Sequence, residues 1–268
     1  MKSMEGRRLK KNQFDTSLKE NHEEISILTK NQLRSSIIIP VHNEIQIIKK
    51  NFQQVIEGIK QIFVDYEIII AEDGSKDGTS NVLKQLAQIN PRITHLYSDI
   101  RLGKGQALKR SIKIAKEKII TFMDADLVTS LKHLPQLVRT IQKGFTIAMG
   151  SRSIKGSLVK RPLIRTITSK IYNLLVRILF KDAIHDHQCG FKAFNRDQIL
   201  PILNEVEDDQ FFFDTELILR TIMRGYKIKE IPVKWEEPED RISKFQLFSD
   251  GIKILIKLLK LRVKLWTH

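Results

Sequence analysis

From residue 36 onwards, short apolar segments alternate with longer amphipathic segments along the chain. The short segments are rich in β-branched residues and end in turn-forming or charged residues, a pattern typical of buried strands. They lie at residues 36–39, 66–71, 93–97, 119–123 and 146–149. The longer segments predict helices at residues 44–62, 77–89, 105–116 and 131–143. This alternation predicts an α/β fold, Rossmann-like, with a mostly parallel central sheet.

After residue 152 the alternation becomes less regular. Residues 163–180 and 213–224 have helical periodicity, and residues 186–190 predict a loop between them. Residues 245–266 predict an amphipathic terminal helix. The second half is therefore expected to elaborate the sheet of the first.

Three parts are expected along the chain. Residues 1–34 are polar and lack sustained periodicity, which predicts a flexible N-terminal tail. Residues 35–243 carry the alternating strands and helices and are expected to form a single domain. Residues 244–268 follow as an amphipathic, membrane-associating helix.

The chain carries a formal net charge of +15, which favours an anionic partner: nucleic acid, acidic lipid or a phosphorylated substrate. Aromatic residues make up 7% of the chain and no nucleic-acid-binding motif is present, so a basic nucleic-acid-binding protein is the weaker alternative. The lone cysteine, Cys189, can form no disulfide within the chain, which favours a cytoplasmic location.

Two carboxylates, Asp124 and Asp126, directly follow the predicted strand at residues 119–123. Strand alternation places both side chains on the same side of the carboxyl edge. Such carboxylates repel each other unless a cation lies between them, and a hard divalent ion that also binds diphosphate oxygens is the usual partner. An isolated pair would more often cap the helix near residue 131. The neighbouring clusters favour the diphosphate site.

Polar residues also follow the first two predicted strands. In an open α/β sheet, ligands bind at the carboxyl ends of the strands. Asp73 is placed there to accept hydrogen bonds from a ribose or a base, and Asp77 is expected to cap a helix. Glu44 is placed to meet the nucleoside, while Asn43 is expected to cap the helix that follows it.

Lys104 lies between two glycines before a predicted helix. A lysine at a helix N-terminus suits a phosphate group or the edge of a nucleotide. The segment matches neither the dinucleotide-binding fingerprint nor the phosphate-binding loop of nucleotide hydrolases, which excludes those two readings.

These clusters, in this order and spacing, resemble the nucleotide-sugar-binding half of inverting family-two glycosyltransferases with the A-type fold. The resemblance spans residues 36–243. It implies a nucleotide-sugar donor and a divalent cation, Mg²⁺ or Mn²⁺. The implied residues are Pro40, Glu44 and Asp73 at the nucleoside, Lys104 beside it, and Asp124 and Asp126 at the metal.

The second half narrows the resemblance to one branch. The motifs Gly150-Ser151-Arg152, residues 186–192 and Phe213-Asp214-Thr215-Glu216 look like the polyprenyl-phosphate branch. Within it, the pattern D-x-Q-C-G-F-K looks like dolichyl-phosphate β-glucosyltransferases, which implies UDP-glucose as donor. Phosphomannose synthases typically carry Gln where this chain has Val128. The alternatives are a GDP-mannose enzyme and a family-two transferase with a glycan acceptor.

The expected chemistry needs no general base, because a lipid monophosphate has a second pKa of about 6 and is already largely the nucleophilic anion at neutral pH. The protein must instead hold two phosphorylated substrates together. Arg152 and Arg165 are the candidates for the acceptor phosphate, since Arg suits bidentate phosphate contacts. Asp186, Gln188 and Glu216 are expected at the sugar pocket or the attacking side, although Asp214 and Glu216 equally suit first-turn helix charges.

Two features depart from the family pattern. His185 and His187 flank Asp186, and such a pair is more typical of solvent-exposed loop residues than of a metal ligand set. The membrane anchor of eukaryotic relatives is missing, and no apolar stretch of about eighteen residues occurs. We therefore expect peripheral contact with the cytoplasmic face of a membrane, or a membrane-anchored partner subunit.

The terminal helix has a wide apolar arc and a separate lysine stripe. The arc consists of Phe248, Ile252, Leu255, Ile256, Leu259, Val263 and Trp266, widened by Ile254, Leu258, Leu261 and Leu265, and the stripe of Lys253, Lys257, Lys260 and Lys264. This pattern suits a helix lying in the headgroup region of an anionic membrane, with packing on the core as the alternative. The helix at residues 163–180 has the same character, so the two helices are expected to frame a lipid-tail groove.

Overall fold

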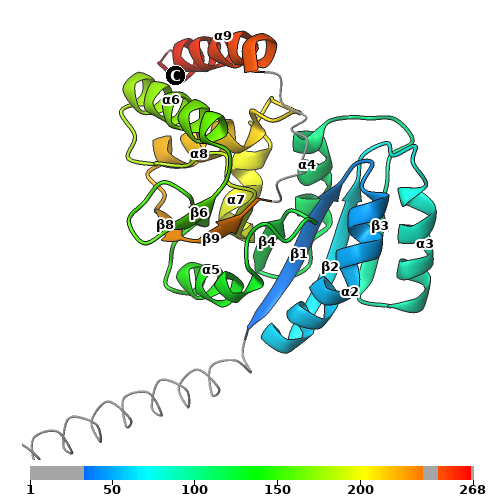
Figure 1. Cartoon of the computed structure of the whole chain (residues 1–268). Coiled ribbons are helices and arrows are strands. Elements are labelled where there is room, and N and C mark those ends of the chain that lie inside the picture. Colours follow the sequence, from blue (N-terminus) through cyan, green and yellow to red (C-terminus); the bar gives the residue numbers. More distant parts are fainter. Residues whose placement is uncertain (1–32, 238–246, 267–268) are drawn as a thin grey trace, which may run out of the picture.

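The computed structural model describes residues 33–237 and 247–266, with side-chain contacts in the last helix given for residues 253–265. A central sheet of seven strands has the order β3-β2-β1-β4-β7-β5-β8 (Figure 1). The strands are β1 (Arg34–Val41), β2 (Asp65–Glu72), β3 (Ile93–Leu96), β4 (Ile119–Met123), β5 (Ile147–Ser151), β7 (Phe191–Asn195) and β8 (Ile228–Pro232). Neighbouring strands are parallel except that β7 runs antiparallel to β4 and β5. The predicted α/β fold with a mostly parallel sheet is confirmed.

Helices cover both faces of this sheet (Figure 1). They are α2 (Ile45–Ile62), α3 (Thr79–Ile89), α4 (Lys104–Ile114), α5 (Leu134–Gln142), α7 (Arg196–Leu203) and α8 (Phe213–Met223), with a 3-10 turn (Leu131–His133) before α5. In β1, Ile37 and Ile39 face a core shared with α2 and α5, whereas Ile38 faces the core shared with α4, α7 and α8. Because both faces are covered, the central strands are continuous apolar runs in the sequence.

Strand β7 is the main difference from the predicted elements. The sequence predicted a loop at residues 186–190 but not the strand that follows it. Because β7 is antiparallel to β4, its first residue, Phe191, pairs with Met123, the last residue of β4. This pairing brings the loop before β7 to the carboxyl edge of the sheet, next to Asp124. Helix α7 and strand β8 were not predicted either.

Helices α6 (Leu163–Phe180) and α9 (Leu247–Trp266) pack together at one end of the molecule, at the top of Figure 1. A third apolar cluster joins them to α8, and it contains Val176, Phe212, Leu219, Ile254, Leu258 and Leu261. A separate two-stranded ribbon is formed by β6 (Leu158–Lys160) and β9 (Lys234–Glu236). Helix α6 has the predicted bounds, and the predicted terminal helix is present from Leu247.

Most of the predicted tail at residues 1–34, namely residues 1–32, lies outside the described residues. Leu33 is buried and β1 begins at Arg34, so these two residues belong to the domain. Among the helices that the structure describes, none is long and apolar enough to cross a bilayer.

Candidate active site

The loops that follow β1 and β2 are hydrogen-bonded to each other. Asn43 has a positive φ of 52°, and its amide oxygen accepts the backbone N–H of Lys76 (2.8 Å). The N–H of Asn43 donates to the Ser75 hydroxyl (3.0 Å), and the N–H of Asp73 donates to the Val41 carbonyl (2.9 Å). The two loops therefore form one hydrogen-bonded rim at the carboxyl edge of the sheet.

Asp77 caps two helices at once. Its Oδ2 accepts the N–H of Ile45 at the start of α2 (3.1 Å), and its Oδ1 accepts the N–H of Thr79 at the start of α3 (3.1 Å). Burial opposes ionisation, but the hydrogen bonds from Thr79 and Ile45 outweigh it and lower the pKa of Asp77. Asp77 thus has the capping role predicted for it, from the position before the N-cap residue Gly78. The prediction that Asn43 caps α2 is wrong, because its side chain binds the neighbouring loop instead.

Asp73 is almost completely buried. Its carboxylate accepts the backbone N–H groups of Leu102 (2.6 Å) and Gly103 (2.9 Å), in the loop that begins α4. A carboxylate has about four acceptor positions, so these two bonds leave room for a ligand. The binding of a ribose or base by Asp73 stays a prediction, and the observed role of Asp73 is to position the loop before Lys104.

That loop is held from a second side as well. Gly103, the N-cap of α4, has a φ of 110°, a conformation that favours glycine. A Cβ at Gly103 would lie 2.2 Å from the carbonyl oxygen of Asp209, so the chain between α7 and α8 packs directly against the loop. The side chain of Gln210 donates to the Leu102 carbonyl (3.2 Å). These contacts therefore fix the position of the Lys104 backbone at the first residue of α4.

Asp124 lies between a cation and a glycine. The Nζ of Lys104 is 3.0 Å from Asp124 Oδ1, and a Cβ at Gly190 would lie 2.1 Å from Asp124 Oδ2. A glycine is therefore required at position 190 for the carboxylate to occupy this place. Burial alone would lower the pKa of Lys104, but Asp124 and Asp214 outweigh burial and raise it, so the ammonium group stays charged.

Asp126 lies at the same edge, and its Oδ1 accepts the N–H of Val128 (3.2 Å). Asp124 and Asp126 are both partly exposed, so a ligand can reach them. Their carboxylate oxygens are the hard ligands that Mg²⁺ and Mn²⁺ prefer. In residues 33–237 and the described part of α9, no group of three His, Cys, Asp or Glu side chains could hold a metal, and Val128 is buried and apolar. The residues therefore fit a cation that takes two ligands from the protein and the rest from its substrate.

A second lysine lies against the same aromatic ring as Lys104. Lys192 in β7 is 1% exposed, its Nζ is 2.8 Å from Asp214 Oδ1, and it lies 5.2 Å from the centre of the Phe122 ring. The Nζ of Lys104 lies 5.4 Å from the same centre. Asp214 is thus a buried ion-pair partner in the first turn of α8, as the expectation of a first-turn helix charge allowed. Lys192 was missed because β7 was not predicted, although a lysine within the apolar run Gly-Phe-Lys-Ala-Phe was an available signal.

Arg152 and Asp186 form a buried bidentate ion pair. The Nε and Nη2 of Arg152 each lie 2.7 Å from a different carboxylate oxygen, and the backbone N–H of Arg152 also donates to Asp186 (2.9 Å). The guanidinium lies over the Trp235 ring, 4.7 Å from its centre. Burial opposes ionisation of Asp186, but Arg152 outweighs it and lowers the pKa of the carboxyl group. The structure brings these two predicted residues together, and each balances the other's charge.

Arg165, the second predicted phosphate ligand, is ion-paired with Glu237. Arg161, four residues earlier and just before α6 begins, donates to the Arg165 carbonyl and to the Ser169 hydroxyl. Its Nε is buried without a hydrogen-bond partner, and among the described residues no carboxylate forms an ion pair with it. Burial and the nearby Arg152 lower the pKa of Arg161 to about 10, so it is protonated at neutral pH. Sequence reasoning missed Arg161, for which the spacing of two arginines around the start of α6 was the available signal.

The two histidines before β7 have different surroundings. His185 is partly exposed, and its Nδ1 lies 2.9 Å from Glu230. His187 is fully buried, with its Nδ1 2.9 Å from the Asn173 amide oxygen and its Nε2 3.4 Å from Asp182. The expectation of solvent-exposed loop residues is therefore wrong for His187, which ties the loop to α6. The two rings contact different partners, which argues against a shared metal ion.

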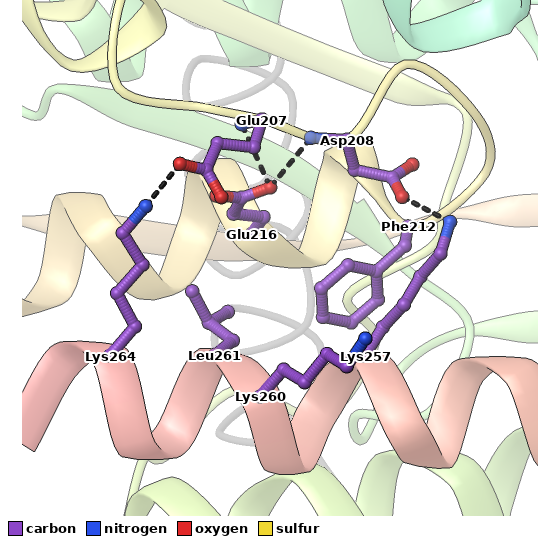
Figure 2. A pocket seen from close by; sticks show the side chains of 8 residues that line it. All are labelled: Glu207, Asp208, Phe212, Glu216, Lys257, Lys260, Leu261 and Lys264. Carbon is purple, nitrogen blue, oxygen red and sulfur yellow. Dashed lines mark hydrogen bonds and ion pairs between the residues drawn. The ribbon is translucent and has the colours of Figure 1, made fainter.

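Glu216 lines a small surface pocket between α9 and the chain around the start of α8 (Figure 2). One of its oxygens accepts the N–H groups of Glu207 (3.1 Å) and Asp208 (2.9 Å), and the other accepts Arg220 Nε (2.8 Å). Residues two apart on a helix point about 200° apart, so Glu216 and Asp214 cannot face the same side of α8. The structure therefore does not bring Glu216 together with Asp124, and its carboxylate holds the chain that precedes α8.

Three predicted residues remain. Pro40 in β1 and Glu44 at the N-cap of α2 are partly exposed at the rim formed by the first two loops. Gln188 is partly exposed in the loop before β7, two residues from Gly190. All three lie at the carboxyl edge, and their contacts with substrate stay predictions.

Comparison with protein families gives a direct assignment. Residues 36–200 match the model of Glycosyl transferase family 2. The match covers more than half of the chain, and the chain therefore belongs to glycosyl transferase family 2. The family resemblance predicted from residues 36–243 is confirmed.

Known relatives agree with this assignment. The chain is 36% identical to Glycosyltransferase AglD of Haloferax volcanii over 76% of its own length, but it spans only 33% of that longer protein. It is 32% identical to Dolichyl-phosphate beta-glucosyltransferase ALG5D of Trichomonas vaginalis, covering 90% of this chain and 78% of that protein. It is 29% identical to Polyprenol monophosphomannose synthase of Mycolicibacterium smegmatis, covering 79% of this chain and 80% of that protein.

A solved structure has the same fold. Glucosyl-3-phosphoglycerate synthase from Mycobacterium tuberculosis, in complex with Mn²⁺, uridine diphosphate and phosphoglyceric acid, superposes with a TM-score of 0.62 over 86% of this chain and 79% of that one. At 18% identity this likeness shows the fold alone. It confirms the expected fold class.

Proposed function

We propose that the protein transfers a hexose from a nucleotide diphosphate sugar, with UDP-glucose as the first choice, to dolichyl or polyprenyl phosphate. The observation that carries the proposal is Asp124 held between Lys104 and Gly190 at the carboxyl edge, within electrostatic range of Arg152. An acidic metal edge beside basic groups suits a reaction between two phosphorylated substrates. The names of the Trichomonas and Mycolicibacterium relatives support a lipid phosphate as acceptor.

On the donor side, Asp124 and Asp126 would hold Mg²⁺ or Mn²⁺, which would neutralise the diphosphate and stabilise its departure. The solved structure with Mn²⁺ and uridine diphosphate supports this choice of ion. Lys104 adds a positive charge on the same side, and Asp73 keeps the loop that carries it in place. The rim around Pro40 and Glu44 is proposed for the nucleoside.

On the acceptor side, Arg152, Arg161 and Arg165 form a basic group near the start of α6. Asp186 balances Arg152 and Glu237 balances Arg165, which leaves the charge of Arg161 for an incoming phosphate. Arg152 and Arg165 are proposed to complete the phosphate site with their remaining N–H donors. Gln188 and Asp186 are proposed beside the sugar, with Asp186 acting through Arg152.

The chemical step is a displacement with inversion. An oxygen of the lipid phosphate attacks the anomeric carbon, the bond from that carbon to the donor diphosphate breaks, and its electron pair leaves with the nucleoside diphosphate. The attacking phosphate is already an anion at neutral pH, so no side chain must remove a proton. The residues contribute by holding both phosphate groups at reacting distance despite their mutual repulsion.

A GDP-mannose donor is the second candidate. The likeness to Polyprenol monophosphomannose synthase of Mycolicibacterium smegmatis supports it. The buried Val128 supports glucose instead, because the mannose enzymes typically carry Gln at this place. A glycan acceptor is the third candidate, and the basic group near α6 argues for a phosphate instead.

We further propose that the protein works as a peripheral protein at the cytoplasmic face of a membrane. A polyprenyl chain keeps the acceptor phosphate at the bilayer surface, so the enzyme must approach that surface. A membrane-anchored partner subunit would serve the same purpose.

A donor screen tests the proposal. The full chain is incubated with dolichyl phosphate, Mn²⁺ and one of UDP-glucose, UDP-N-acetylglucosamine or GDP-mannose, and the lipid product is extracted and identified by mass spectrometry. UDP-glucose is expected to give the fastest transfer. Faster transfer from GDP-mannose would establish the mannosyl alternative, and transfer to a glycan but not to dolichyl phosphate would overturn the proposed acceptor.

The proposed acceptor site has its own test. Arg161→Gln is expected to raise the KM for the lipid phosphate about tenfold, the loss of one charge-assisted contact, while UDP binding measured by calorimetry stays unchanged. Arg110→Gln, which changes a partly exposed arginine on α4, is the matched control. An unchanged KM in Arg161→Gln would remove this residue from the acceptor site.

A further inference from the structure

Helix α6 carries an exposed apolar face. Its large apolar side chains that point away from the domain are between 39% and 79% exposed, and they are Leu163, Ile164, Ile167, Ile171, Leu174, Leu175 and Ile178. At 100° per residue these positions form an arc about 120° wide. The opposite side of the helix is the packed one, where Asn173 and Val176 are buried. The exposed face is therefore additional to the core contacts of α6.

Helix α9 repeats this arrangement beside α6. Ile254, Leu258 and Leu261 are buried in the third apolar cluster. This side of α9 therefore packs on the core, which was the alternative to membrane contact. Leu255, Ile256, Leu259 and Val263 are exposed on another arc. The two helices together hold eleven of the twenty-one exposed large apolar residues of the described chain, seven on α6 and four on α9. The exposed apolar surface is thus concentrated at one end of the molecule.

Two lysines of the predicted α9 stripe have a different role from the one predicted. Lys257 pairs with Asp208 and Lys264 pairs with Glu207, on the chain before α8 (Figure 2). These two lysines hold α9 against the domain instead of facing a membrane. The predicted arc members Phe248, Ile252 and Trp266 lie outside the described side chains.

The charged residues within α6 and within residues 251–266 of α9 are all basic. Helix α6 contains Arg165, Lys170 and Arg177 but no Asp or Glu, and residues 251–266 of α9 likewise contain no acidic residue. Two copies of such a surface would repel each other, because each brings the same positive charge. An anionic lipid surface complements both the charge and the apolar arc.

We propose that the exposed face of α6, extended by that of α9, docks on the surface of an anionic bilayer, with the apolar side chains entering the headgroup region. Arg165 lies in the first turn of α6, and Arg161 lies just before that helix begins. Docking would therefore bring the proposed acceptor site to the depth at which a polyprenyl phosphate presents its headgroup. This inference deepens the proposed function and rests on it for the acceptor, but bilayer binding itself needs no transfer.

Vesicle flotation of the full chain, without donor or acceptor, tests the docking surface. The probes are phosphatidylcholine vesicles with and without phosphatidylglycerol. The variant Ile171→Gln/Ile178→Gln is expected to lower partitioning onto anionic vesicles at least tenfold. The matched control is Ile89→Gln/Ile114→Gln, which changes two exposed isoleucines at the ends of α3 and α4 and should bind as wild type. Unchanged thermal midpoints would show that both variants are folded.

Equal binding of the α6 variant and the wild type would overturn the proposal. The proposal would also be overturned if the wild-type chain did not bind vesicles but formed a dimer, and the α6 variant were monomeric. A second copy of the chain would then cover the exposed face. Transfer to a short-chain, water-soluble polyprenyl phosphate separates the two proposals. The α6 variant should retain transfer to this soluble acceptor. If the wild type binds vesicles but does not transfer to the soluble acceptor, the proposed function is contradicted and the docking surface is still supported.

Discussion

Several of the charged residues in the two halves of the site are held in place by different means. In the nucleotide half, carboxylates accept backbone N–H groups: Asp73 holds the start of α4, and Asp77 holds the starts of α2 and α3. In the second half, side-chain charges hold one another, as in the pairs Arg152–Asp186 and Lys192–Asp214. The partners in the first half belong to nearby loops at one edge, whereas the second pairs join separate elements.

This difference determines what each half offers a ligand. A carboxylate bound to backbone N–H groups stays negatively charged and keeps acceptor positions for a nucleoside or a metal. A buried ion pair is balanced by the protein, and removing one partner leaves an uncompensated charge. The nucleotide half therefore presents carboxylates, and the second half presents the charge of Arg161.

The metal edge gives the largest expected effect. Asp124→Asn and Asp126→Asn should each lower transfer by about 10³-fold or more, because a bound metal contributes several kcal/mol to stabilising the departing diphosphate. Neither carboxylate is a core contact, so the thermal midpoint should stay close to that of the wild type. Transfer and thermal unfolding are measured on the same preparations, with the exposed Asp197→Asn as control. Near wild-type turnover in either variant would remove that residue from the metal site.

Breaking a long-range ion pair should cost stability instead. Asp186→Asn leaves the buried Arg152 without a counter-charge and is expected to lower the free energy of unfolding by about 3 kcal/mol. The control is Asp65→Asn, whose partner Arg92 is on the surface and whose loss should cost at most about 1 kcal/mol. Urea unfolding compares the two. Equal effects would show that burial does not distinguish this pair.

The same pair predicts a pH dependence. Arg152 holds the pKa of Asp186 below that of the unfolded chain, which is about 4. The stability that this carboxylate contributes is therefore complete above the unfolded pKa and is lost as the pH falls through the lower folded value. Asp186→Asn should show a flatter decline of stability in acid than the wild type. Parallel acid curves would contradict the ion-pair assignment.

The next effect concerns geometry at Asp124. Gly190→Ala places a Cβ only 2.1 Å from Asp124 Oδ2, and displacing the carboxylate by about 1 Å should cost about 10²-fold in transfer. Gly150→Ala is the comparison, because its Cβ would lie 2.9 Å from the Val233 side chain and disturb apolar packing. We expect activity loss with little destabilisation in the first variant and the reverse in the second. Full activity in Gly190→Ala would show that Asp124 does not need its present position.

The sequence predicted the first half well because its signals are local. Most strands up to residue 149 contain a continuous apolar run. Asp73 and Asp124 follow directly after β2 and β4, Asp126 lies in the loop after β4, and Lys104 begins the helix after β3, so topology alone brings them to one edge. Strand β7 escaped prediction because its lysine interrupts the apolar pattern, and Lys192 is buried only because Asp214 balances its charge.

The second half could not be predicted to the same extent, because its contacts join distant segments. Nothing local to Glu216 indicates that its carboxylate binds the chain before α8, and nothing local to His187 indicates burial against Asn173. Arg152 and Arg165 were found by residue type, but their partners Asp186 and Glu237 became evident only in the fold. The identity of a charged residue in the sequence therefore does not show whether its charge is balanced within the protein or left to bind a ligand.

The smallest effect is expected at Asp77, the local counterpart of Asp186. Asp77 is exposed, so water competes for its hydrogen bonds with the N–H groups of Ile45 and Thr79. Asp77→Ala should therefore lower the free energy of unfolding by about 1 to 2 kcal/mol, the usual contribution of helix caps. Asp77→Asn keeps an oxygen acceptor and should recover most of the loss, whereas an amide at position 186 still leaves Arg152 uncompensated. Urea unfolding of the four variants at both positions, with Ala and Asn at each, measures this contrast directly. If Asn rescues position 186 as fully as position 77, hydrogen bonding and not charge holds the second half, and the proposed distinction between the two halves is lost.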